Sequence, residues 1–313
     1  MRLRSMLFVP ADSPRKLAKA CDSRADALIL DLEDSVAPPN KAAAREAAAQ
    51  FLKGRGAGLA VQRFVRINPL DSELSLKDLA AVVVPGLDGI MLPKIDGAQD
   101  VRRLALYLDA LEVRAGIEPG HIRIVPVATE TPRAMLGMGS FEPGIPRMVG
   151  VTWGAEDLSA AVGAITNREA DGAYSPLYVF ANSLCLCAAA AAEVDAIDTL
   201  HADFRDREGL VAACAVARRR GFRGKIAIHP DQVDIINGAF TPSAEETEHA
   251  RRIVQAFDAE PGLGALSIDG VMVDLPHLKQ ARRTLGLQGP GGHSGQERGT
   301  DRIRMLDAAR ALN

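Results

Sequence analysis

Two stretches, IRIVPVATETP at residues 122–132 and MVGVTWGAEDL at residues 148–158, decide the fold of this 313-residue chain. Each begins as a short run rich in β-branched residues, bounded by glycine, proline or threonine, which is typical of a buried parallel strand. Each then continues into a carboxylate, Glu130 in the first stretch and Asp157 in the second. Such acids lie just past the carboxyl ends of strands, where α/β folds place their chemistry.

Six further strand-like runs share this character and lie at residues 6–9, 25–30, 63–67, 89–92, 194–197 and 225–228. Most are separated by helical stretches, so the pattern predicts an α/β fold, a (β/α)₈ TIM barrel over residues 1–230. An open doubly wound sheet is the alternative, but no GxGxxG follows the first strand. Residues 231–287 exceed a closing helix and read as a C-terminal helical arm, and residues 288–313 read as a flexible tail.

Composition excludes several classes of function. The net charge is −3, from 37 basic and 40 acidic residues, and aromatic residues make up 4%, so neither a basic surface nor stacking platforms for nucleic acid are expected. No apolar stretch is long enough for a signal peptide or a membrane span. The four cysteines form no CxxC pair, which fits a reducing compartment. We therefore expect a cytoplasmic protein with no nucleic-acid or membrane partner.

Charged residues recur at the carboxyl ends of the predicted strands: Asp31, Glu33, Asp34, Arg66, Lys94, Glu130, Glu156, Asp157 and His229. In a barrel these ends meet on one face. Carboxylates that lie close together repel one another unless a proton or cation compensates them. We therefore expect Glu130 and Asp157 to bind Mg²⁺, with Mn²⁺ as a substitute. Arg66 suits bidentate capture of a substrate carboxylate, and its alternative role is a salt bridge with Glu33 or Asp34.

The motifs along the chain resemble the citrate lyase beta subunit-like family. They are RSxLFVP at residues 4–10, DLEDSV at 31–36, VRIN at 65–68, LPK at 92–94, ETP at 130–132, GAEDL at 154–158, IHPxQ at 228–232 and MVDLP at 272–276. The resemblance implies a Mg²⁺-dependent barrel that cleaves a carbon–carbon bond in a 3-hydroxy-acyl thioester. The family's metal-binding acids fall on Glu130 and Asp157, and its substrate-binding arginine falls on Arg66.

Further roles also follow from the resemblance. In free-standing members the first loop and helix hold coenzyme A, which by match falls on Phe8, Arg15 and Lys19. A catalytic aspartate, delivered from the arm of a neighbouring subunit, falls on Asp274. An apolar run at residues 271–273 precedes it and needs a partner surface. We therefore expect the arm to form a lid over a neighbouring barrel in a homo-oligomer, a trimer. The alternative is that Asp274 only caps a helix beginning near Pro276.

The resemblance favours a free-standing lyase acting on malyl-CoA, citramalyl-CoA or citryl-CoA, because the chain carries the arm and Asp274. A related aldolase branch cleaves free 4-hydroxy-2-oxo acids and would not need Phe8, Arg15 and Lys19. Three further alternatives remain open at this point. The first is a citrate lyase beta subunit that acts on an acyl-carrier-protein thioester within a complex. The second is a malyl-CoA thioesterase, and the third is a non-catalytic subunit that only binds the thioester. A non-catalytic subunit is expected to lack a metal-binding acid or Arg66, and this chain has all of them.

Overall fold

The computed structural model of the protein describes residues 1–286, and the predicted tail at 288–313 lies outside the described residues. Tertiary contacts divide the chain into two compact units, Met1–Pro242 and Ser243–Asn313. The first unit includes the helix that follows the last strand, so the division falls twelve residues beyond the predicted barrel end at residue 230. Within residues 1–286, no helix is both long and apolar enough to cross a membrane.

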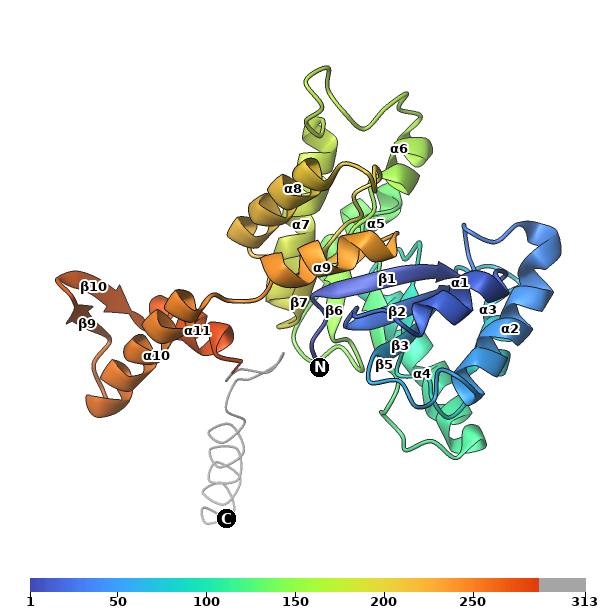
Figure 1. The fold of residues 1–313 in the computed structure, drawn as a ribbon, viewed down its shortest axis with the longest axis horizontal. Coiled ribbons are helices and arrows are strands. Elements are labelled where there is room, and N and C mark those ends of the chain that lie inside the picture. The colour runs from blue at the N-terminus through green and yellow to red at the C-terminus, as the bar shows by residue number, and fades with distance from the viewer. Residues whose placement is uncertain (287–313) are drawn as a thin grey trace, which may run out of the picture. The chain divides into compact units, whose positions relative to one another are not determined.

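The first unit is built on eight strands (Figure 1), namely β1 (Ser5–Pro10), β2 (Ala27–Asp31), β3 (Gln62–Arg66), β4 (Gly89–Leu92), β5 (Arg123–Pro126), β6 (Gly150–Thr152), β7 (Asp195–Asp198) and β8 (Gly224–Ala227). They pair in the order β5-β4-β3-β2-β1-β8-β7-β6, and every pair is parallel. Isolated parallel bridges join Ile124 to Met148 and Val127 to Thr152, which brings β5 beside β6. The predicted (β/α)₈ barrel is thereby confirmed.

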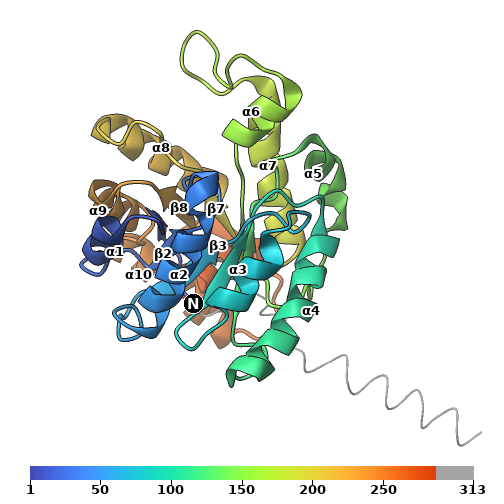
Figure 2. The ribbon, with the colours of Figure 1, turned by 90° about the vertical axis from the view of Figure 1, so that its right-hand side faces the viewer.

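Helices surround these strands (Figure 2). They are α1 (Pro14–Ala20), α2 (Lys41–Lys53), α3 (Ser75–Val82), α4 (Ala98–Ala115), α5 (Pro132–Gly137), α6 (Glu156–Val162), α7 (Pro176–Ala191), α8 (Arg207–Arg220) and α9 (Pro230–Ala239), with 3₁₀ turns at Pro38–Asn40 and Met138–Ser140. Four of the helices, α1, α5, α7 and α9, begin with proline in the first turn, where its missing N–H costs nothing. The short helices α5 and α6 were not predicted, because each spans fewer than two full periods of the apolar pattern.

Strand alternation divides the core into two layers. The barrel interior is filled by one apolar cluster, which includes Met6, Ile29, Phe64, Met91 and Ile226. The residues between these positions, such as Leu28 and Leu30 of β2, pack outward with the helices in a second, larger cluster. Because side chains two apart share a face of a strand, Asp31 continues the interior row of Ala27 and Ile29. The carboxyl end of the barrel therefore receives charged side chains that point into it.

The amino-terminal end of the barrel holds a different kind of charged group. Glu112 of α4 is fully buried and accepts hydrogen bonds from the backbone N–H groups of Gly120, at 2.8 Å, and Ile122, at 2.7 Å. The Arg147 guanidinium lies 2.5 Å from the same carboxylate and 2.5 Å from Asp109. Burial alone would raise the pKa of Glu112, but these donors hold it below its ordinary value. The negative charge of Glu112 is therefore balanced by two N–H donors and a guanidinium.

The second unit contains the helices α10 (Ala244–Ala259) and α11 (Leu275–Thr284) and an antiparallel hairpin of β9 (Ala265–Ile268) and β10 (Val271–Asp274). Phe257 of α10, Val273 and Leu278 belong to its small apolar core. The helices were predicted and the hairpin was not. Its turn places Asp269 and Gly270 at positive φ, 52° and 79°, and Asp-Gly between apolar residues is a strong hairpin signal.

Candidate active site at the carboxyl end of the barrel

Arg66 and Asp31 form the centre of the predicted site. They are the last residues of β3 and β2, and they lie directly opposite each other in the strand register. The Nε and Nη2 atoms of Arg66 each lie 2.7 Å from one oxygen of Asp31, a bidentate pair. Its Nη1 lies 3.0 Å from Glu33. Of the salt bridges considered for Arg66, the one with Glu33 is present at close range, and Asp31 is a partner that was not predicted.

Phe8 of β1 lies beneath this arginine. The Cζ atom of Arg66 is 4.5 Å from the centre of the Phe8 ring, a cation–π contact, and the ring packs on the interior cluster. Arg15 and Lys19, which were predicted to share a coenzyme A site with Phe8, lie instead on the exposed side of α1. The structure thus brings Phe8 beside Arg66 and leaves Arg15 and Lys19 exposed to solvent, and their role in binding coenzyme A stays a prediction.

Glu130 follows β5 and is held there by the start of α5. Thr131 caps that helix by accepting a hydrogen bond from Ala134 N–H at 2.9 Å, and the Glu130 side chain is only 4% exposed. A Cβ atom at Gly154 would lie 2.9 Å from the Glu130 Cγ, so this glycine leaves room for the glutamate. Burial, together with the negative charge of Asp157, raises the pKa of Glu130 to about 8.

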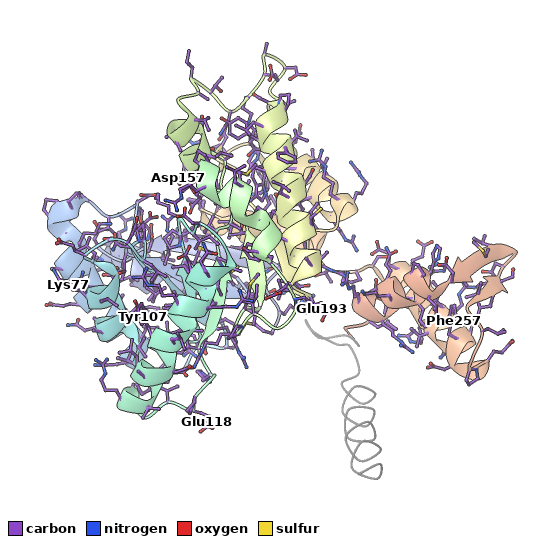
Figure 3. All side chains as sticks on the ribbon, turned by 180° about the vertical axis from the view of Figure 1, so that it is seen from behind. Lys77, Tyr107, Glu118, Asp157, Glu193 and Phe257 are labelled. Atoms are coloured by element: carbon purple, nitrogen blue, oxygen red, sulfur yellow. The ribbon has the colours of Figure 1, made fainter. Side chains whose placement is uncertain are left out.

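Asp157, labelled in Figure 3, lies in the first turn of α6, where the helix dipole favours an acid. Between the two predicted metal ligands lies Lys94, which was predicted to lie on this face of the barrel but was assigned no role. Its backbone N–H donates to Glu130 Oε2 at 2.6 Å, and its ammonium lies 3.1 Å from Asp157 Oδ1. The ammonium also contacts Asp34, at 2.9 Å, and Glu33. Lys94 adopts a φ of +50°, which no sequence pattern signals for lysine.

The donor set of this cluster fits Mg²⁺. No group of three metal-binding His, Cys, Asp or Glu side chains is present within residues 1–286, so a cation between Glu130 and Asp157 would have two protein ligands. A hard cation that keeps several water or substrate oxygens suits such a pair. Burial and the charge of Asp157 raise the pKa of Glu130, and a cation bound at the pair would offset both. The residues present therefore fit the predicted metal.

His229 and Asp274 have local hydrogen-bond partners. His229 caps α9, accepting from the Asp231 N–H at 3.2 Å, and stacks on Phe204. Asp274 belongs to the second unit and is the N-cap of α11, with its Oδ1 2.5 Å from His277 Nδ1. The capping role considered for Asp274 is thus present, and its catalytic role stays a prediction.

Comparison with known proteins identifies the family to which this chain is similar. Residues 4–230 match the model of the HpcH/HpaI aldolase/citrate lyase family. Citrate lyase subunit beta of Escherichia coli K12 is 36% identical over 284 residues, which is 90% of this chain and 92% of that protein. A (3S)-malyl-CoA thioesterase of Cereibacter sphaeroides is 34% identical over 284 residues, 90% of this chain and 93% of that protein.

A solved structure extends the comparison to ligands. The CitE protein of Mycobacterium tuberculosis, in complex with magnesium, acetoacetate and coenzyme A, superposes with a TM-score of 0.70 at 34% identity. The match covers 93% of this chain and 99% of that one. The family model covers the barrel, and the relatives and the solved structure extend the match over 90% or more of the chain. This chain belongs to the HpcH/HpaI aldolase/citrate lyase family and is an enzyme of that family.

Proposed function

We propose that the protein is a Mg²⁺-dependent carbon–carbon lyase that cleaves a 3-hydroxy-acyl-CoA thioester of the malyl-, citramalyl- or citryl-CoA type into acetyl-CoA and an oxo acid. The observation that carries this proposal is the cluster at the carboxyl end of the barrel. There the buried Glu130 and the partly exposed Asp157 adjoin an arginine held by a bidentate carboxylate. The magnesium and coenzyme A in the CitE structure support it.

In this proposal, Glu130 and Asp157 would hold Mg²⁺, which would supply Lewis-acid activation of the oxo-acid half. Arg66 binds the carboxylate of that half, and Asp31 and Glu33 keep its guanidinium oriented. Asp274 exchanges a proton with the carbon of the thioester half that is freed by cleavage. Arg15 and Lys19 bind the phosphates of coenzyme A.

The arm is part of the same proposal. Asp274 lies in the second unit beside exposed apolar residues, and Val271 and Met272 are each about two-thirds exposed (65% and 64%). We propose that this face covers the barrel of a neighbouring subunit in a trimer and delivers Asp274 to its site. Mixing inactive Asp274→Ala with inactive Asp157→Ala subunits restores activity if the site is shared. No recovery after verified subunit exchange assigns Asp274 to capping alone.

Thioester hydrolysis is a second candidate, because the malyl-CoA thioesterase relative and the citrate lyase subunit each match this chain over 284 residues. The extent of the match therefore does not choose between a lyase, a thioesterase and a subunit acting on an acyl carrier protein. A panel of malyl-, citramalyl- and citryl-CoA with Mg²⁺ separates them. Acetyl-CoA identifies the lyase, free coenzyme A with an intact hydroxy acid identifies the thioesterase, and no turnover with any CoA ester favours the carrier-protein subunit.

A further inference from the structure

We propose that the Lys94 ammonium is the internal cation of the acid cluster in the metal-free protein, and that Mg²⁺ binds by displacing it from Asp157. The inference rests on the proposed function, because it concerns the same metal site. Lys94 would then be a positioning residue that sets the affinity for the metal and holds its ligands in place before the metal arrives.

The contacts of Lys94 carry the first step. Among the described residues, Lys94 alone bonds to both predicted metal ligands, and it uses a different group for each. Its backbone N–H lies 2.6 Å from Glu130, while its ammonium lies 3.1 Å from Asp157. The ammonium also reaches Glu33 and Asp34, so it lies among three carboxylates that follow β2 and β6. A single positive charge at this position reduces the repulsion among them.

The backbone at Lys94 carries the second step. Lysine rarely adopts a φ of +50°, so the surrounding contacts must hold it there. Asn or Gly would fit this conformation with less strain. The conformation is the one in which the N–H meets Glu130 while the side chain extends to Asp157. The strained backbone of Lys94 therefore allows this one residue to contact both Glu130 and Asp157.

Charge balance carries the third step. Five carboxyl groups gather here, those of Asp31, Glu33, Asp34, Glu130 and Asp157, and within residues 1–286 Arg66 and Lys94 are the cations paired with them. Arg66 is already engaged by Asp31 and Glu33, which leaves Lys94 as the cation beside Asp157. Asp157 Oδ1 cannot contact the ammonium closely and bind Mg²⁺ in the same direction. The Lys94 side chain is 26% exposed on a flexible stem, so it can withdraw toward solvent.

The test compares Lys94→Met with wild type by Mg²⁺ titration calorimetry and by thermal unfolding in chelator and in saturating Mg²⁺. Methionine keeps an unbranched stem and the backbone N–H but removes the charge. We expect Mg²⁺ to bind at least about fivefold more tightly to Lys94→Met. We expect its Tm in chelator to lie below that of wild type, because Asp34 and Asp157 lose their nearest cation and Glu33 loses one of two, and we expect the difference to shrink in Mg²⁺.

Lys41→Met is the matched control. The Lys41 ammonium lies 2.7 Å from the carbonyl oxygens of Leu32 and Glu33, so it is near the same loop but bonds to no carboxylate there. Removing it changes the charge of the region equally without freeing Asp157. We expect less than a twofold change in Mg²⁺ affinity.

Three outcomes overturn the inference. Mg²⁺ binding no tighter in Lys94→Met than in Lys41→Met means that the two cations do not compete. A Tm deficit that Mg²⁺ does not reduce means that Lys94 is structural only. If Lys94→Met does not fold, Lys94→Arg decides, because its charged fork should weaken Mg²⁺ binding, and unchanged affinity refutes displacement. A wild type that binds no Mg²⁺ refutes the metal in the proposed function itself, whereas the Tm deficit in chelator would still stand.

Discussion

Two buried glutamates at opposite ends of the barrel have opposite electrostatic environments. Glu112, at the amino-terminal end, receives two backbone N–H groups and an arginine, which hold its pKa below the ordinary value. Glu130, at the carboxyl end, receives one N–H and faces Asp157, and its pKa rises to about 8. The first environment stabilises an ionised acid, and the second leaves one poised to receive a proton or a cation. The difference separates the stabilising end of the barrel from the reactive one.

The largest expected effect is the loss of turnover in Glu130→Gln. The amide keeps the shape but removes a metal-binding charge, and a Lewis acid contributes several kcal/mol to the transition state, so turnover should fall about 10⁴-fold. The free energy of unfolding at pH 7 should change by less than about 1 kcal/mol, because a neutral amide replaces a largely protonated acid. Steady-state kinetics and urea unfolding check both. A stable variant with wild-type turnover would remove Glu130 from the site.

The same change at the other end should have the reverse result. Glu112→Gln removes the buried charged partner of Arg147 and leaves the exposed Asp109 as its remaining carboxylate. Breaking a buried pair typically costs about 3–5 kcal/mol, so a loss of about 3 kcal/mol of folding free energy is expected. The fraction that remains folded should bind Mg²⁺ as wild type does. Urea unfolding and Mg²⁺ titration are the measurements. A loss of metal affinity with unchanged stability would contradict the division between the two ends.

Two arginines on one strand sharpen the comparison further. Arg66 pairs with Asp31 at the end of β3, and Arg63 pairs with Asp88, at 2.7 Å, near its start. Arg66→Lys keeps the charge but loses the bidentate fork, so turnover should fall about 10–100-fold. Arg63→Lys should leave turnover unchanged and reduce stability alone. Equal kinetic losses in both variants would mean that Arg66 is only structural.

The smallest expected effect is a pair of opposite pH slopes in chelator. The pKa of Glu112 is lowered from 4.5 on folding, so its contribution is full above that value and is lost as pH falls through the folded pKa. The pKa of Glu130 is raised to about 8, so the folded state holds its proton longer and stability declines from about pH 4.5 to 8. Tm measured against pH checks both. Glu112→Gln should lose the rise in stability on the acid side, and Glu130→Gln should lose the decline in stability between about pH 4.5 and 8. Parallel profiles for all three proteins would contradict the contrast.

Sequence patterns predicted the barrel because every strand is a short apolar run that ends at a glycine, a proline or a charge. They also predicted that Arg66 lies with the acids. Asp31 was recognised as a strand-end acid but not as the partner of Arg66, although continuing the alternation of β2 by one position places it in the interior row. Strand register, which decides that pairing, depends on contacts distant in sequence.

The role of Lys94, unlike its position at a strand end, could not have been predicted in the same way. Its role depends on a left-handed backbone conformation and on three acids from other segments. The hairpin around Gly270 did carry a local signal, the Asp-Gly pair, which an assignment of the arm as helical overlooked. Local chemistry thus predicts elements and turns, whereas charge networks require the folded chain.

Barrel closure gives the two acids a mechanical role as well. Among the described strands, β5 and β6 are joined only through the isolated bridges at Ile124–Met148 and Val127–Thr152. Glu130 follows β5 and Asp157 follows β6, so the acids stand on opposite sides of this seam. An ion that binds both therefore fastens the two edges of the sheet, and part of its binding energy opposes the opening of the barrel. The Ala128 N–H donates to the Thr152 carbonyl across this seam at 2.8 Å. Slower hydrogen exchange at that amide would therefore report metal binding without any substrate.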